Sequence, residues 1–180
     1  SAWQNGAIAV PVDFMASTQE VAYIIKDCQP EVVFCSKDRL EVMLKALEEA
    51  QSNARLLIID EHETPALAFT SEKELREVEK ESTAVLIYTS GTTGSPKGVM
   101  LSFVNLLQNI DAVSNHIHIY DKDSRVLILL PLHHIFPLMG TMIIPLYVGA
   151  STAISPSMVS ADIMATLQNN RITIIIGVPR

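Results

Sequence analysis

Residues 86–102, LIYTSGTTGSPKGVMLS, combine several kinds of group that bind phosphate. Gly91, Gly94 and Gly98 leave backbone N–H groups uncovered, and a run of such groups forms an anion-binding nest. Lys97 adds a compact positive charge, and hydroxyls are supplied by Ser90, Thr92, Thr93 and Ser95. The spacing differs from the common P-loop, G-x-x-x-x-G-K-[ST], because Lys97 lies between a proline and a glycine. A flexible polar linker explains neither the paired threonines nor the apolar strand expected on each side, so the stretch predicts a phosphate site.

The composition indicates a globular protein with a substantial core. The chain has 180 residues, of which 48% are hydrophobic and 18% charged, which favours one domain or slightly more. A net charge of −7 without any basic run argues against a nucleic-acid partner. Cys28 and Cys35 are expected to be reduced, buried thiols rather than a disulfide. No basic region precedes the apolar N-terminal run, so a signal peptide is not indicated and a cytoplasmic location is expected.

A long segment without charge raises the alternative of a membrane span. Residues 126–161 contain no Asp, Glu, Lys or Arg, but four prolines interrupt the run, at positions 131, 137, 145 and 156. No uninterrupted stretch of about twenty apolar residues remains, which is the length that a spanning helix needs. We therefore expect buried strands and a buried helix and no transmembrane span, with peripheral membrane contact left open.

The hydrophobic pattern alternates between the two periods of helix and strand. Ser17 and Glu20 form a capping box before a helix, and further helices are expected at 38–50, 105–116, 136–147 and from 160, with a short one near 72–78. Strands are expected at 32–35, 56–60, 84–90, 126–132, 151–155 and 172–178. Such alternation predicts an α/β fold with a doubly wound, mostly parallel sheet and helices on both faces.

The motif YTSGTTGSPKGV at 88–99 resembles the phosphate-binding signature of the adenylate-forming superfamily, which includes acyl-CoA synthetases, peptide-synthetase adenylation domains and luciferases. Residues 7–34 look like the segment that precedes this signature. LPLHHIFPLMG at 130–140 looks like the next family motif, and TIIIGVPR at 173–180 like the strand where the acyl pocket begins. The later adenine, ribose and hinge motifs have no counterpart, so the resemblance implies that 1–180 is part of an N-terminal domain, without the C-terminal domain.

The resemblance also implies a reaction and its residues. A carboxylic acid would be activated by ATP with Mg²⁺ and then transferred to coenzyme A, and Lys97 and His134 would be the catalytic residues. ATP would be bound by Thr89, Ser90, Gly91, Thr92, Thr93, Gly94 and Lys97. Thr89 would lie nearest the metal, whose main ligand is expected outside this chain, and His134 would line the acyl pocket. A core histidine is the alternative for His134, His133 is taken as structural, and a metal site using His116 and His118 is not favoured.

The residues that follow His134 indicate which class of carboxylic acid is the substrate. The chain reads Ile-Phe-Pro-Leu-Met-Gly there, with no carboxylate to pair with the ammonium of an amino acid. Burying an ammonium without a counter-charge is costly, so an apolar acid is favoured. A fatty acyl-CoA synthetase is preferred; another acyl- or aryl-acid ligase, a peptide-synthetase domain and a non-catalytic nucleotide-binding module remain open. The chain alone is expected to be inactive, to expose apolar surface and to self-associate.

Overall fold

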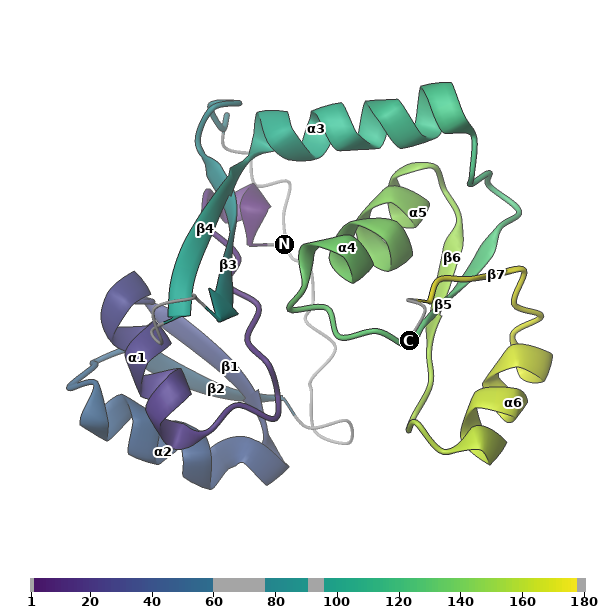
Figure 1. The fold of residues 1–180 in the computed structure, drawn as a ribbon. Helices are drawn as coiled ribbons and strands as arrows, with labels where there is room; N and C mark the ends of the chain where they lie inside the picture. Colours follow the sequence, from purple (N-terminus) through teal and green to yellow (C-terminus); the bar gives the residue numbers. More distant parts are fainter. Residues whose placement is uncertain (1, 60–76, 91–95, 178–180) are drawn as a thin grey trace, which may run out of the picture.

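The computed structural model describes residues 2–59, 77–90 and 96–177 (Figure 1). The backbone of Ser90 is included but not its side chain. The helix expected near 72–78 lies mostly outside these ranges. Within them the chain alternates helices and short strands, and two hydrophobic clusters support it.

The first cluster lies in the N-terminal part. The capping box forms as expected: the Ser17 hydroxyl accepts from the Glu20 amide at 3.3 Å, and the Glu20 carboxylate accepts from the Ser17 amide at 2.8 Å. Helix α1 then runs from Thr18–Cys28, and α2, after a 3₁₀ turn at Lys37–Arg39, occupies Leu40–Glu49. The two helices pack on each other, and strands β1 (Val32–Ser36) and β2 (Arg55–Ile59) pair in parallel beside them. The buried members of this cluster are Ala16, Val21, Ala22, Ile25, Ala46 and Leu47.

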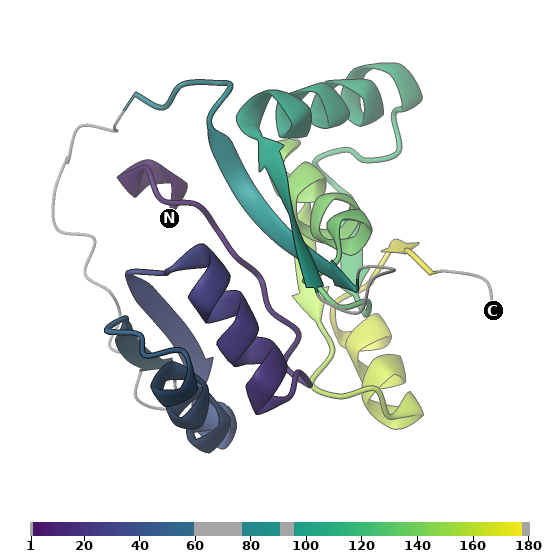
Figure 2. The same cartoon turned by 60° about the vertical axis from the view of Figure 1, so that its left-hand side comes forward.

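The middle of the chain is an antiparallel hairpin. Strand β3 (Thr83–Ser90) pairs with β4 (Pro96–Ser102), and the N-terminal segment joins β3 through a parallel bridge between Ala9 and Val85. Before this bridge a 3₁₀ turn at Trp3–Asn5 places the Trp3 indole, which donates to the Ala84 carbonyl at 2.9 Å. Figure 2 shows this N-terminal segment running beside the hairpin.

The C-terminal part holds the remaining sheet, with strand order β6-β5-β7 and all pairs parallel. Its strands are β5 (Arg125–Ile128), β6 (Ser151–Ile154) and β7 (Ile174–Ile175). Helix α3 (Phe103–Asp111) continues as a π-helix over Ala112–Ile117. A second helical run comprises α4 (Ile135–Pro137), a π-helix at Leu138–Ile143 and α5 (Ile144–Tyr147), and α6 covers Ser160–Asn169.

The second cluster joins this part to the hairpin. Val85 and Ile87 of β3 pack with residues of α3, β5 and the helical run 135–147. The buried members are Ala84, Val85, Ile87, Leu106, Ile110, Tyr120, Val126, Leu138, Met139 and Ile144. One face of β3 is therefore fixed by core packing along most of its length.

The α/β class is confirmed, but the expectation of one doubly wound, mostly parallel sheet is not met by the described residues. Their strands form three separate sheets, and the β3–β4 pair is antiparallel. Only five residues connect β3 to β4, which suits a hairpin but not the longer crossover that parallel pairing requires. The last strand is also shorter than the expected 172–178.

The charge-free segment forms short elements. In the part of the chain that the structure describes, no helix is long and apolar enough to cross a membrane. The run contributes β5, the helices of 135–147 and β6 instead. Strand β1, expected to be buried, is open on one face, where the side chain of Phe34 is 62% exposed.

Candidate active site

The hairpin carries the phosphate motif at its turn. Thr89 and Lys97 are direct partners across β3 and β4, and the last pair before the turn is Ser90 with Pro96. Directly opposite residues in an antiparallel pair project their side chains to the same face, so the Thr89 hydroxyl and the Lys97 ammonium share one face. Both residues are exposed. The structure therefore brings two of the predicted site residues together, next to the turn.

Gly91, Thr92, Thr93 and Gly94 lie outside the described residues, as does the side chain of Ser90. Their assignment stays a prediction from the motif.

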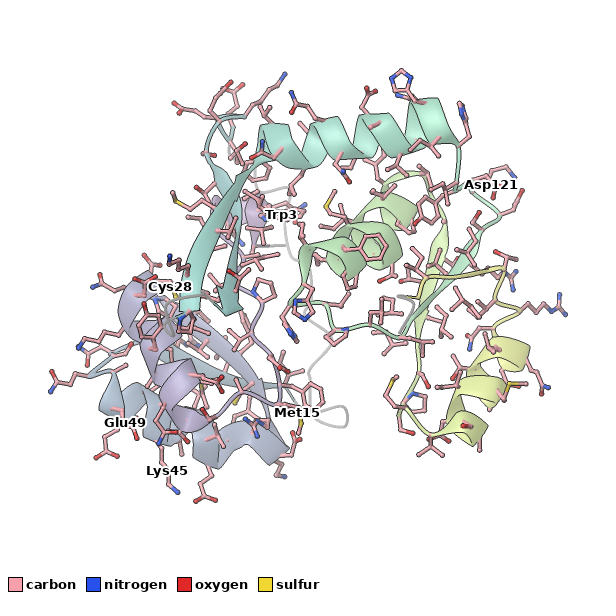
Figure 3. All side chains as sticks on the ribbon, viewed as in Figure 1. Trp3, Met15, Cys28, Lys45, Glu49 and Asp121 are labelled. Atoms are coloured by element: carbon pink, nitrogen blue, oxygen red, sulfur yellow. The ribbon has the colours of Figure 1, made fainter. Side chains whose placement is uncertain are left out.

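Tyr88 lies on the opposite face of the hairpin, toward α1. Its hydroxyl donates to the Asp27 carboxylate, with 2.6 Å between the phenolic oxygen and Oδ2. Burial raises the pKa of Tyr88, and this hydrogen bond raises it further, so the phenol stays protonated as a donor. Burial likewise raises the pKa of the neighbouring Cys28 thiol. Figure 3 shows Cys28 on α1 beside the hairpin.

His134 stands at the start of the helical run 135–147. Its carbonyl accepts from the Leu138 amide at 3.1 Å, and its own amide donates to the Pro131 carbonyl at 3.3 Å. The residue is exposed and is not part of either hydrophobic cluster of the described residues. In Figures 1 and 2 the segment leading into α4 lies beside the turn end of the β3–β4 hairpin. His134 thus lies on a segment close to the phosphate motif.

The ring of His133 lies against the ring of His134, and His133 is the less exposed of the two residues. The two imidazole rings are 4.2 Å apart between centroids, with an angle of 51° between their planes. Only 15% of the His133 side chain is exposed, and its Nε2 lies 3.8 Å from Oδ2 of Asp13. Burial lowers the pKa of His133, and the Asp13 charge opposes that shift. The acidic neighbour of His133 comes from the segment before α1, and a structural role for His133 stays a prediction.

The described ranges contain no group of side chains that would form a metal site. No three His, Cys, Asp or Glu residues there are grouped closely enough to hold an ion. His116 instead has its Nε2 3.7 Å from Oδ2 of Asp111 at the end of α3.

Sequence reasoning did not identify three residues that form contacts at or beside the candidate site. Tyr88 was within the motif but received no role, and Asp27 and Asp13 were not considered. The tyrosine beside Thr89 was the available signal, since period-two alternation places it on the opposite face. Nothing in the sequence links either aspartate to its partner, because both contacts join distant parts of the chain.

Comparison with known proteins fixes the family. The model of the family described as AMP-binding enzyme matches residues 1–180, the whole chain. The chain belongs to this family.

Two curated relatives illustrate its range. The human protein named malonate–CoA ligase ACSF3, mitochondrial, is 31% identical over 191 aligned positions, which cover 99% of this chain and 31% of that protein. The human long-chain-fatty-acid–CoA ligase ACSBG2 is 42% identical over 98 positions, 54% of this chain and 15% of its own length. This AMP-binding chain thus spans less than a third of the length of either relative.

A solved structure supports the fold. The ATP-bound MatB of Rhodopseudomonas palustris superposes with a TM-score of 0.78 at 24% identity. The match covers 98% of this chain and 35% of that one. The fold of this chain is therefore the fold of the corresponding part of that structure.

Proposed function

We propose that this chain is the phosphate-binding part of an ATP-dependent ligase that joins a carboxylic acid to coenzyme A. One observation carries the proposal: Thr89 and Lys97 are direct partners on one face of the β3–β4 hairpin, beside its turn. The AMP-binding family model matches the whole chain, including this hairpin. Residues 1–180 would be part of an N-terminal domain in a longer protein, whose further strands would complete a doubly wound sheet.

The proposed reaction has two steps. A carboxylate oxygen attacks the α-phosphorus of ATP, the bond to the β-phosphate breaks, and acyl-adenylate and pyrophosphate form. The thiol of coenzyme A then attacks the acyl carbon and AMP leaves. Lys97 would neutralise the charge that grows on pyrophosphate, and Thr89 would donate a hydroxyl, with Ser90, Gly91, Thr92, Thr93 and Gly94 completing the cradle. His134 would line the acid pocket.

Magnesium fits this arrangement as a partner of the nucleotide. Mg²⁺ bound with ATP usually keeps several waters and takes most of its other ligands from phosphate oxygens. The exposed Thr89 hydroxyl suits one coordination position, and the described residues offer no carboxylate cage that would compete with the phosphates. Bound there, the ion would neutralise charge on the β- and γ-phosphates.

An apolar acid, such as a fatty acid, is the proposed substrate. The side chain of Phe136, just after His134, is 54% exposed at the start of the helical run, and Ile135 beside it is also exposed. No Lys or Arg lies between Arg125 and Arg171 to pair with a second charge on the acid. The likeness to the long-chain-fatty-acid–CoA ligase supports the same reading.

A short dicarboxylic acid is the second candidate, because the relative named malonate–CoA ligase matches 99% of this chain. The name of that relative describes it as mitochondrial. The cytoplasmic location expected for this protein therefore stays a prediction. The test is ATP–pyrophosphate exchange by the full-length protein with malonate, an aryl acid and fatty acids of increasing length. Exchange that is fastest with fatty acids supports the first candidate and exchange with malonate alone the second, whereas no exchange with any acid would leave a nucleotide-binding module.

A further inference from the structure

Tyr88 and Thr89 are neighbours on β3 and point to opposite faces of the hairpin. Thr89 shares its face with Lys97, while Tyr88 shares the other with its partner Gly98. A Cβ placed on Gly98 would lie 3.3 Å from Cζ of Tyr88 and 3.0 Å from Cδ1 of Leu86. The Tyr88 ring therefore lies across β4 at a position where a side chain on residue 98 would crowd it.

The far end of that ring is fixed by α1. Its hydroxyl donates to Asp27 at 2.6 Å, and Cys28, the last residue of α1, lies beside it. Helix α1 is part of the N-terminal hydrophobic cluster, whereas Ile87 of β3 is part of the other cluster. The Asp27–Tyr88 bond thus joins the two clusters at a point one residue from Thr89.

The location of this bond matters because the burial of β3 in the core ends before Thr89. Val85 and Ile87 are buried, but Thr89 beyond them on the same face is exposed, as is its partner Lys97, so the core does not enclose the Thr89–Lys97 pair. The face toward α1 is where a further constraint can act. We propose that Asp27 and Tyr88 are positioning residues, which hold the end of β3 against α1 so that Thr89 and Lys97 present a fixed pair of donors to the leaving pyrophosphate. This inference rests on the ligase function proposed above.

Matched variants of the full-length protein separate the hydrogen bond from the ring. Tyr88→Phe keeps the ring and removes the donor, Asp27→Ala removes the acceptor, and Asp27→Asn keeps an acceptor oxygen. Tyr23→Phe makes the same chemical change on the exposed Tyr23 of α1 and is the control. Both disruptive variants should slow ATP–pyrophosphate exchange by roughly two- to tenfold, the scale of one partly exposed hydrogen bond. Asp27→Asn should retain most activity and Tyr23→Phe all of it.

Two further readouts distinguish positioning from general support of the fold. The loss should appear in kcat for exchange, with KM for the acid unchanged, because only the donors to the leaving group move. Combining Tyr88→Phe with Asp27→Ala should cost no more than either change alone, since both remove the same bond. Fully additive losses, or a loss confined to KM for the acid, would overturn the proposal.

Amide hydrogen exchange tests the bond without relying on activity. Amides of residues 86–89 and 97–100 should exchange roughly two- to tenfold faster in Tyr88→Phe and Asp27→Ala, with α6 unchanged. If no acid supports pyrophosphate exchange in the wild-type protein, the ligase function fails while this measurement still reports on the bond. Unchanged hairpin amides would refute the bond's role, and faster amides with unaltered kcat would show that it supports structure but does not position the donors.

Discussion

The Oδ2 atom of Asp13 lies 3.8 Å from Nε2 of His133, so the segment before α1 meets the segment before α4. The other Asp13 oxygen accepts from the Met15 amide at 2.9 Å, which orients the carboxylate locally. His133 in turn lies against the exposed ring of His134. The proposed acid-binding histidine is therefore supported by a neighbour whose own surroundings are set from the N-terminal part of the chain.

This pair should make stability depend on pH in a defined direction. Burial lowers the pKa of His133 below its ordinary value of 6.5, so the unfolded state binds a proton more readily than the folded state. The stabilising contribution is then complete above about pH 6.5 and is lost as the pH falls through the folded-state pKa. We expect His133→Gln to flatten the fall in thermal unfolding midpoint between pH 7.5 and 5.5 in the full-length protein. Asp13→Asn should steepen it, because the charge that favours the protonated ring is removed; equal slopes in all three proteins would contradict the assignment.

Lys97→Ala should slow adenylate formation in the full-length protein. One charge-assisted contact to the leaving phosphates is lost, and a single donor of this kind contributes roughly tenfold to thousandfold to the rate. Pyrophosphate exchange at saturating acid measures it. Lys122→Ala, at an exposed lysine paired with Asp123, provides the control and should behave as wild type. Equal exchange rates for the Lys97 variant and wild type would remove Lys97 from the site.

His134→Ala should alter the acid site more than the nucleotide site. The exposed His134 is followed in the sequence by the exposed apolar residues Ile135 and Phe136, so its loss should raise KM for the acid by several-fold, roughly the effect of one pocket contact. KM for ATP should change less. His116→Ala, at an exposed histidine on the helical segment after α3, is the matched control. Impaired ATP binding with an unchanged KM for the acid would place His134 at the nucleotide instead.

Gly98→Ala should destabilise the hairpin by crowding. The added methyl group would meet Leu86 and the Tyr88 ring, and overpacking of this kind costs about 1–3 kcal/mol, toward the lower end where side chains can move. Chemical denaturation of the full-length protein measures the change in unfolding free energy. Gly177→Ala is the control, since among the described residues, its chain neighbours apart, no atom lies within 4 Å of a Cβ placed there. If both variants lost the same stability, the close approach to Tyr88 would not be the cause.

Local signals predicted much of this structure, because they depend on nearby residues. The Ser17–Glu20 capping box set the start of α1, and helical spacing located α2 and α6 to within a few residues. The arrangement of strands was harder to predict. The β3–β4 hairpin follows from a connection too short for a parallel crossover, yet the alternation of helices and strands was interpreted as one doubly wound, mostly parallel sheet.

The residues of the candidate site also fall into those that short motifs predicted and those that depend on tertiary contacts. Thr89, Lys97 and His134 were predicted from the resemblance of two short motifs to those of a family, and such motifs are contained in short stretches of sequence. The contacts of Tyr88 with Asp27 and of His133 with Asp13 were not, because side-chain partners from distant segments depend on tertiary packing. Alternation along β3 could have shown that Tyr88 faces away from Thr89, but not which helix it meets.

The 180-residue chain alone should neither turn over substrate nor remain monomeric. Adenylation depends on positioned reactants as much as on charge, and the part of the chain that the structure describes offers the phosphates Thr89 and Lys97, both exposed and competing with water and salt. Large apolar side chains are also open, including Phe14 at 66%, Phe34 at 62% and Met15 at 69% exposure, and such surface promotes association. Incubation with ATP, Mg²⁺ and fatty acids should release no pyrophosphate, and sedimentation velocity should show a concentration-dependent increase in size. Turnover on the order of one per second, the scale of an ordinary enzyme, would refute the proposal that the rest of a longer ligase is needed to position the reactants. A monodisperse monomer at high concentration would show that the exposed apolar residues are too scattered to drive association.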